Sequence, residues 1–194
     1  VGETALPGKH NLENMLAAAA VSWAAGIRSE TIGRTLRAFK GVAHRLEYVG
    51  NFRGITFIND SKGTNTGATI KALESFPQKV ILIAGGKDKG ADFEDLAPFI
   101  KKRVKRLILL GETRDKIVRA VQKEDFTDFI LVNSIEAAVR ASYQLAVEGD
   151  LVLLSPACAS WDMFNNYEER GSEFKRAAKL LGRETNEKSK GEAS

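Results

Sequence analysis

Five short runs of apolar residues recur along the later part of the chain, separated by segments of helix length. Each run is continuously apolar, whereas a strand with one solvated face would alternate, so we expect strands that are buried on both faces of a parallel sheet. The runs cover residues 55–58, 80–84, 107–110, 129–132 and 151–154. Segments with apolar positions at helical spacing cover residues 66–75, 93–103, 113–123, 134–147 and 171–181.

Strand and helix in regular alternation predict the fold class. We expect an α/β domain with a Rossmann-like, doubly wound, mostly parallel sheet and right-handed crossovers. Residues 46–52 are β-rich and predict an edge strand beside the first run. Residues 47–183 are therefore expected to form one complete domain.

The first part of the chain predicts two helices and no strand. Residues 11–25 are rich in Ala and Leu until Gly26 ends the run, and a second helix begins at Ser29 and ends before Gly41. Without a sheet of their own to cover, these helices look like the end of another domain, and we expect the chain to begin inside a longer protein. At the other end, residues 184–194 are charged and poor in apolar side chains, so we predict a disordered tail.

Composition excludes several classes of function. Among 194 residues, 29 Lys and Arg stand against 25 Asp and Glu, and the basic residues are scattered, which disfavours nucleic-acid binding. No apolar run is long enough to cross a membrane. The single cysteine, Cys158, allows no internal disulfide and favours a reducing compartment, so we expect the cytoplasm.

The same residue counts argue against cysteine or transition-metal chemistry. His10 and His44 are the only histidines and lie far from Cys158 in the sequence, so a Cys–His nucleophile pair and a transition-metal site are both disfavoured. We expect Cys158 to be a small packing residue.

Three loops that follow predicted strands are unusually polar. In open α/β sheets, ligands bind outside the carboxyl ends of the strands, so residues 59–65, 85–90 and 155–162 are expected to converge on one rim. Helix capping could explain one polar residue in the first loop, but a cap does not require as many polar groups as this loop has beside Lys62. These are Asp60, Ser61, Thr64 and Asn65, which together favour a ligand site. Gly85 and Gly86 could form only a tight turn, although the lysines around Asp88 favour anion binding.

Two common nucleotide-binding motifs are absent from the sequence. No G-x-G-x-x-G follows the first predicted strand of the α/β domain, and no G-x-x-x-x-G-K-[ST] occurs in the chain. The rim therefore lacks both the dinucleotide fingerprint and the P-loop.

Four motifs in order and spacing resemble the Mur ligases, the amide-forming ligases of bacterial cell-wall synthesis. The motifs H-N-x-x-N from His10 and H-R-x-E from His44 are similar to the family at large. D-S-K-G-T-N from Asp60 and S-P-A-C-A-S from Ser155 resemble its D-glutamate-adding members. The resemblance extends over residues 8–182.

The resemblance implies an ATP-dependent ligase of three domains that functions in peptidoglycan synthesis, and thereby in cell shape and division. Residues 1–46 would end the central ATP-binding domain, and residues 47–183 would form the C-terminal, amino-acid-binding domain. ATP and Mg²⁺ would activate the carboxylate of UDP-N-acetylmuramoyl-L-alanine as an acyl phosphate, which the amine of D-glutamate attacks. Most Mg²⁺ ligands and the N-terminal and remaining central domains would precede Val1. The chain alone is expected to be inactive.

The resemblance also implies roles for individual residues. Arg45 and His44 would be catalytic. The residues that would bind ATP are Asn11, Asn14, Arg45, Asp60 and Lys62, and those that would bind D-glutamate are Thr64, Lys89, Ser160, Trp161 and Tyr167. The side-chain chemistry agrees with part of the D-glutamate assignment. A dicarboxylate needs cationic and hydroxyl donors, which Lys89, Thr64 and Ser160 supply. At positions 161 and 167 the family pattern would also accept Leu and Phe.

Three alternatives stay open at this point. One is a Mur ligase that adds another amino acid, and another is a folylpolyglutamate synthase-like enzyme. The D-S-K-G-T-N loop argues against both. The third is a non-catalytic nucleotide-binding α/β module, which would leave the motifs around His10 and His44 unexplained.

Overall fold

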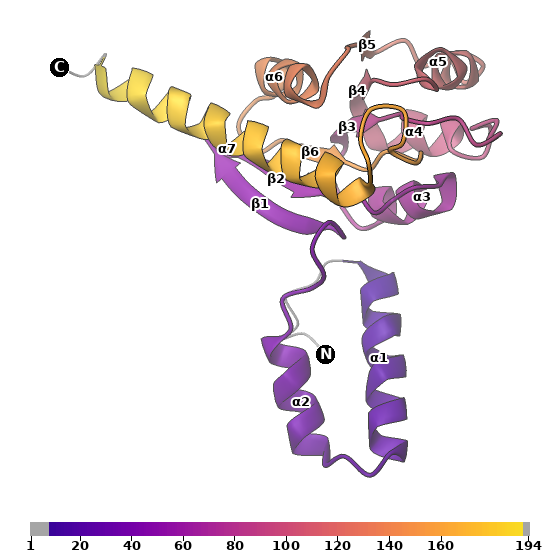
Figure 1. Ribbon diagram of the computed structural model, residues 1–194, viewed down its shortest axis with the longest axis vertical. Coiled ribbons are helices and arrows are strands. Elements are labelled where there is room, and N and C mark those ends of the chain that lie inside the picture. Colours follow the sequence, from indigo (N-terminus) through magenta and orange to yellow (C-terminus); the bar gives the residue numbers. More distant parts are fainter. Residues whose placement is uncertain (1–7, 192–194) are drawn as a thin grey trace.

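The computed structural model describes residues 8–191 and contains a helical hairpin followed by an α/β unit (Figure 1). The hairpin consists of α1 (Lys9–Ala24) and α2 (Ser29–Ala38). Residues 1–7, on which part of the predicted first domain falls, and residues 192–194, at the end of the predicted tail, lie outside the described residues.

A six-stranded sheet forms the centre of the α/β unit, with strand order β1-β2-β6-β3-β4-β5. Strand β1 pairs antiparallel with β2, and every other pairing is parallel. The expected Rossmann-like α/β fold with an edge strand is therefore confirmed. The strands are β1 (Glu47–Phe52), β2 (Ile55–Asn59), β3 (Val80–Ala84), β4 (Val104–Leu109), β5 (Phe129–Leu131) and β6 (Leu151–Leu154).

Helices cover both faces of this sheet, which explains why the central strands are apolar without alternation. Successive residues of β3 point to opposite faces, with Leu82 in one core cluster and Ile83 in the other. The first cluster lies under α3 (Thr66–Glu74), α4 (Ala97–Arg103) and α5 (Arg114–Gln122), and the second under α6 (Ile135–Leu145) and α7 (Tyr167–Gly191).

The C-terminal tail differs from the prediction, because α7 continues as a helix to Gly191. Residues 184–191, which we expected to be disordered, have helical backbone and extend beyond the sheet in Figure 1. The sequence between Arg183 and Gly191 contains no proline and no internal glycine, and extending an existing helix avoids the cost of nucleating a new one. Low hydrophobicity therefore did not end the helix.

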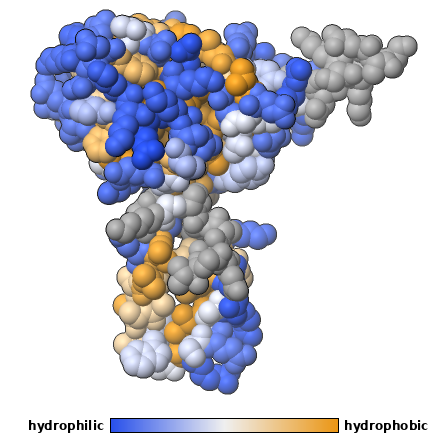
Figure 2. Space-filling model, turned by 180° about the vertical axis from the view of Figure 1, so that it is seen from behind, coloured by the Kyte–Doolittle hydropathy of each residue, from blue (hydrophilic) through white to orange (hydrophobic). Residues whose placement is uncertain are grey.

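The helical hairpin buries little apolar surface. Met15 is buried, but Leu16, Val21 and Trp23 of α1 are exposed. Figure 2 shows apolar side chains gathered over the hairpin, whereas the visible face of the α/β unit is mainly hydrophilic. The burial that the composition of α1 predicts is thus not provided by the described part of this chain.

Candidate functional site

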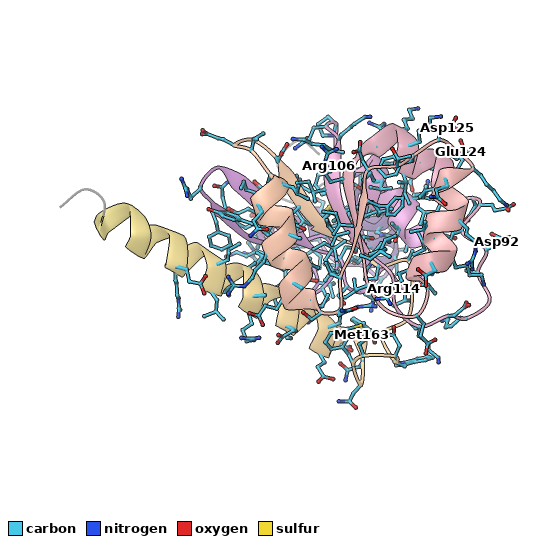
Figure 3. All side chains as sticks on the ribbon, turned by 90° about the horizontal axis from the view of Figure 1, so that it is seen from above. Asp92, Arg106, Arg114, Glu124, Asp125 and Met163 are labelled. Carbon is cyan, nitrogen blue, oxygen red and sulfur yellow. The ribbon has the colours of Figure 1, made fainter. Side chains whose placement is uncertain are left out.

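The three polar loops meet at one edge of the sheet, as the sequence predicted. Strands β2, β6 and β3 are parallel neighbours, so their carboxyl ends lie side by side. The backbone N–H of Gly85 donates to the carbonyl of Pro156 at 2.9 Å, and that of Lys87 to the carbonyl of Ala159 at 2.9 Å. Figure 3 shows Arg114 and Met163 at this end of the strands and Arg106 and Asp125 at the other. We call this edge the rim.

The two glycines after β3 allow the close approach of these loops. Gly85 has a φ of 107°, and a Cβ there would lie 2.0 Å from the carbonyl oxygen of Leu110. Gly86 has a φ of 148°, and its Cβ would lie 2.3 Å from the carbonyl oxygen of Ala159. Any side chain at either position would push the loops apart.

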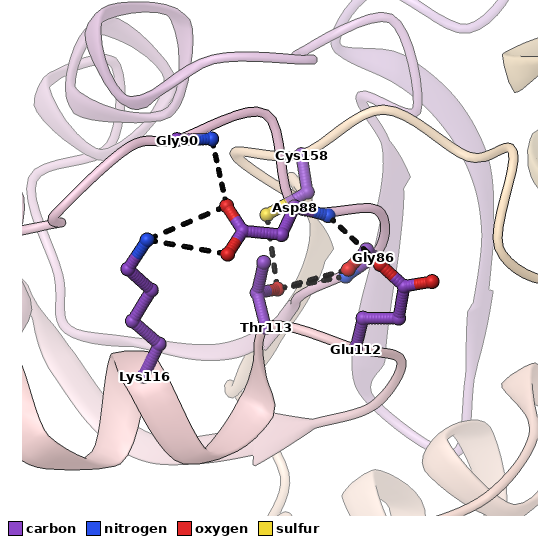
Figure 4. Close-up of polar contacts among 7 residues, drawn as sticks. All are labelled: Gly86, Asp88, Gly90, Glu112, Thr113, Lys116 and Cys158. Carbon is purple, nitrogen blue, oxygen red and sulfur yellow. Dashed lines mark hydrogen bonds and ion pairs between the residues drawn. The ribbon is translucent and has the colours of Figure 1, made fainter.

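Neighbouring groups fix the charges of the loop after β3 (Figure 4). Asp88 accepts a hydrogen bond from the N–H of Gly90 and pairs with Lys116 at 3.2 Å, and these contacts hold its pKa below the ordinary range. Lys87 pairs with Glu112 at 2.8 Å, which raises the pKa of the lysine. Two of the three charged side chains in the loop are therefore paired with oppositely charged residues of the protein.

Lys89 is the remaining charge of that loop, and no carboxylate of residues 8–191 lies within salt-bridge distance of it. Its ammonium lies 5.5 Å from the centre of the Trp161 ring. An ammonium without an acidic partner, in the lining of a cavity, is suited to an anionic ligand.

Lys89 lines a cavity of 340 Å³ together with Thr64. The other lining residues are Asn65, Thr66, Lys87, Gly90, Ala91, Phe93, Ala157, Cys158 and Ala159. Ser160 follows directly in the chain and is 2% exposed, whereas Trp161 is 65% exposed. Tyr167, the first residue of α7, lies instead beside Lys62, with its hydroxyl 3.2 Å from the Nζ atom.

The predicted nucleotide residues line two further cavities that share Arg45. A cavity of 230 Å³ is lined by Arg45, Asp60 and Lys62, and also by Lys71 from α3. Another of 360 Å³ lies at the hairpin and is lined by Asn11, Asn14 and Arg45, among others. The structure thus places Arg45 between the hairpin and the rim.

Asp60 is a buried carboxyl group at the end of β2. Its Oδ2 atom accepts a hydrogen bond from the Ser155 hydroxyl at 2.7 Å, and its Oδ1 atom accepts one from the backbone N–H of Leu46 at 3.3 Å. Burial raises the pKa of Asp60 to about 6, although both hydrogen bonds and the nearby Arg45 and Arg170 favour the charged form. Desolvation outweighs these contacts.

His44 lies in the junction between the hairpin and the sheet, with a left-handed backbone at φ 63°. Its Nδ1 atom is 3.0 Å from Nδ2 of Asn59, and its backbone N–H donates to Glu47. Burial, with Lys175 nearby, lowers the pKa of His44 and favours a neutral ring that accepts from Asn59. The three cavities described above are not lined by this ring.

Arg170 is a residue of the rim that sequence reasoning missed. It is 2% exposed on α7, and its guanidinium donates to the Ser61 hydroxyl and carbonyl at 3.0 and 2.8 Å. It also donates to the carbonyls of Cys158 and Ala159 at 3.1 and 3.2 Å. Burial lowers its pKa to about 10, so it stays charged at neutral pH. Nothing in the sequence separates it from the exposed arginines of helical segments.

Cys158 is buried, as predicted for a packing residue. Its Sγ atom lies 3.2 Å from the hydroxyl of Thr113, and burial raises the pKa of the thiol to about 11. Across residues 8–191, no cluster of three or more His, Cys, Asp or Glu side chains could hold a metal ion, and no helix could cross a membrane.

Comparison of the sequence with known proteins gives a clear family match. Residues 44–158 match the model of the family described as Mur ligase, glutamate ligase domain. The chain is 52% identical over 180 residues to the UDP-N-acetylmuramoylalanine--D-glutamate ligase of Caldanaerobacter subterraneus subsp. tengcongensis, covering 92% of this chain and 40% of that protein. It is 49% identical over 173 residues to the ligase of the same name from Clostridioides difficile, covering 89% and 38%. The chain thus spans about two fifths of the length of these relatives.

Solved structures show the same fold at low sequence identity. UDP-N-acetylmuramate-alanine ligase from Thermotoga maritima superposes with a TM-score of 0.68 at 16% identity, covering 92% of this chain and 40% of that one. A Mycobacterium tuberculosis folylpolyglutamate synthase complexed with ADP and AMPPCP gives a TM-score of 0.64 at 14% identity, covering 92% and 41%.

Proposed function

Because this chain belongs to the Mur ligase family, we propose that it supplies the amino-acid-binding part of an ATP-dependent ligase that adds D-glutamate to UDP-N-acetylmuramoyl-L-alanine. In this reaction ATP phosphorylates the carboxylate of the UDP-linked substrate, releasing ADP. The D-glutamate amine then attacks the acyl phosphate, and phosphate leaves as the amide forms. The observation that carries the proposal is Lys89, an ammonium without an acidic partner beside Thr64 in a cavity at the rim.

In this proposal the rim holds a dicarboxylate. Lys89 offers a charged donor, and the hydroxyls of Thr64 and Ser160 offer neutral donors on the two adjoining loops. Trp161 would complete the amino-acid site beside Lys89, and Tyr167, which lies beside Lys62, would border it. The relatives with about 50% identity are named as D-glutamate ligases, which supports this substrate over those of the other family members.

The nucleotide would lie on the other side of the rim. Arg45 and Lys62 would face its phosphates from the 230 Å³ cavity, which suits a planar, permanently charged guanidinium and a mobile ammonium. Asn11 and Asn14 would lie near the adenine, and Asp60 would meet the nucleotide from the end of β2. Most ligands of Mg²⁺ would come from outside this chain, because residues 8–191 contain no cluster of acidic or imidazole ligands.

We propose the domain division near residue 46 on the same grounds. The family match begins at residue 44, and the helical hairpin ends at Ala38, before β1 begins at Glu47. Residues 1–46 would then complete a central ATP-binding domain, and residues 47–183 would form the amino-acid-binding domain. The single buried cysteine supports a cytoplasmic location for the reaction.

The test uses two lysines of one loop that differ in their partners. The chain is titrated with D-glutamate, L-glutamate and ATP while backbone amide shifts are followed by NMR. D-Glutamate should shift the amides near Thr64, Lys89 and Ser160 more than L-glutamate does. Lys89→Gln should weaken D-glutamate binding by about ten- to a hundred-fold, because a hydrogen bond to a charged group contributes roughly 1.5–3 kcal/mol.

Lys87→Gln is the matched control, because Lys87 lies two residues away but is paired with Glu112. It should weaken D-glutamate binding much less than Lys89→Gln does. Equal shifts with both enantiomers would show that this cavity is not the D-glutamate site. Because Lys87 also lines the cavity, a larger loss from Lys87→Gln would instead refute the role proposed for Lys89.

A further inference from the structure

Two lysines of the rim lie over aromatic rings that come from the same segment. The Nζ atom of Lys89 lies 5.5 Å from the centre of the Trp161 ring, and that of Lys62 lies 5.0 Å from the centre of the Tyr167 ring. Both distances fall within the range in which an ammonium is attracted to the face of a ring. The two rings lie on either side of the turn that leads from β6 into α7.

These two lysines of the rim also share the lack of an acidic partner. Lys87 and Lys116 are held by Glu112 and Asp88, whereas within residues 8–191 no carboxylate lies at salt-bridge distance from Lys62 or Lys89. A lysine side chain has four rotatable bonds, so fixing its ammonium on a ligand costs conformational entropy. A ring that already holds the ammonium lowers this cost without neutralising the charge.

The Tyr167 ring is itself fixed from several sides. Its backbone carbonyl accepts a hydrogen bond from the Ser61 hydroxyl at 2.8 Å, and its ring meets that of His44 edge-on at 6.1 Å. Its hydroxyl accepts a hydrogen bond from Lys62 at 3.2 Å, and a hydrogen bond from Tyr167 lowers the pKa of Glu168. The ammonium of Lys62 is thus located by both the ring and the hydroxyl.

Trp161 has a different setting, because 65% of its surface is exposed. It contributes nothing to either core cluster of the sheet. Its one described aromatic or cation contact among residues 8–191 is the ring face toward Lys89. Removing this side chain should therefore leave the fold intact, which makes its role testable in isolation.

We propose that Trp161 and Tyr167 are positioning residues that hold the ammonium groups of Lys89 and Lys62 at the rim through their rings. Trp161 would thus act on D-glutamate through Lys89, and Tyr167 on the nucleotide phosphates through Lys62. The consequence for D-glutamate rests on the proposed function, whereas the restraint of the lysines exists without any ligand.

The experiment measures the restraint of the lysines and the binding of D-glutamate separately. The order parameters of the lysine ammonium groups are recorded by NMR in the chain without ligand, followed by titration with D-glutamate. Trp161→Leu should increase the mobility of the Lys89 ammonium, leave that of Lys62 unchanged, and weaken D-glutamate binding by about two- to five-fold, as expected for an exposed cation–π contact. Trp161→Phe keeps a ring, so the order of the Lys89 ammonium and the affinity for D-glutamate should stay close to those of the unaltered chain.

Tyr167→Phe keeps the ring and removes the hydroxyl, so it should loosen Lys62 less than Tyr167→Leu does and leave Lys89 unchanged. The matched controls are Trp23→Leu and Tyr48→Phe, because Trp23 is 71% exposed on α1 and Tyr48 is 63% exposed on β1. Neither control should change the mobility of Lys62 or Lys89.

The outcomes distinguish the two proposals. If Trp161→Leu leaves the Lys89 ammonium as ordered as before, or if Trp23→Leu loosens it equally, the positioning role is refuted. If Trp161→Leu loosens Lys89 but the unaltered chain shows no preference for D-glutamate, the positioning role stands and the proposed substrate is wrong.

Discussion

Asp60 should make the stability of this protein depend on pH in a direction opposite to that of a salt-bridged carboxylate. The carboxyl group is 6% exposed, and burial raises its pKa from the ordinary value of 3.8 to about 6. The folded chain therefore binds this proton more tightly than the unfolded chain does. Between about pH 4 and pH 6 the folded state carries more protons, so the free energy of unfolding falls as the pH rises.

The magnitude follows from the two pKa values. A tenfold difference in proton affinity is worth about 1.4 kcal/mol, so the difference between 3.8 and about 6 corresponds to roughly 3 kcal/mol. This stabilisation is complete below pH 4 and is lost as the pH passes through 6. Asp60→Asn removes the titration and keeps the shape, at a cost of about 1 kcal/mol for one lost acceptor of the hydrogen bonds from Ser155 and Leu46.

Urea unfolding of both proteins at several pH values tests this reasoning. The difference between Asp60→Asn and the unaltered chain cancels the titration of all other groups. It should move by roughly 3 kcal/mol in favour of the variant between pH 4 and pH 7. Asp92→Asn provides the control for an exposed aspartate. A difference that stays constant from pH 4 to pH 7, or that moves against the variant, would refute the argument that burial dominates at Asp60.

Three further predictions follow from the rim. Arg170→Met should lower the free energy of unfolding in urea by about 1–3 kcal/mol for each buried carbonyl that it leaves unpaired, and Arg170→Lys should lower it less. Gly85→Ala should lower the melting temperature in calorimetry, with a loss of at least about 2 kcal/mol, because its Cβ would meet the Leu110 carbonyl at 2.0 Å. Cys158, with a pKa of about 11, should be alkylated at pH 8 far more slowly in the folded than in the unfolded chain, as measured by mass spectrometry.

The α/β fold and the position of the rim could be predicted from the sequence because both depend on local patterns. Continuous apolar runs such as that of β3 require helices on both faces of the sheet, and parallel strands bring their carboxyl ends to one edge. The polar loops after β2, β3 and β6 therefore had to meet. The D-S-K-G-T-N motif then connected this edge with a family.

The end of α7 was not predictable from composition. A charged segment poor in apolar residues is typical of disorder, yet it also lacks the residues that stop a helix. Which tendency prevails depends on the helix that precedes it. Phe174, Ala178 and Leu181 anchor α7 on the sheet, and the helix continues from there to Gly191.

The charges of the rim were decided only by the tertiary structure. In the sequence Lys87 and Lys89 are equivalent, and both line the cavity, but the loop after β4 brings Glu112 to the first and leaves the second without an acidic partner among residues 8–191. Likewise, the α7 residue Arg170 is buried against two loops, and Asp60 holds its proton to about pH 6. Hydropathy along a chain indicates which segments become buried on folding. The charge state and partner of a polar group depend instead on desolvation and on residues distant in sequence, so they are settled only when the loops have come together.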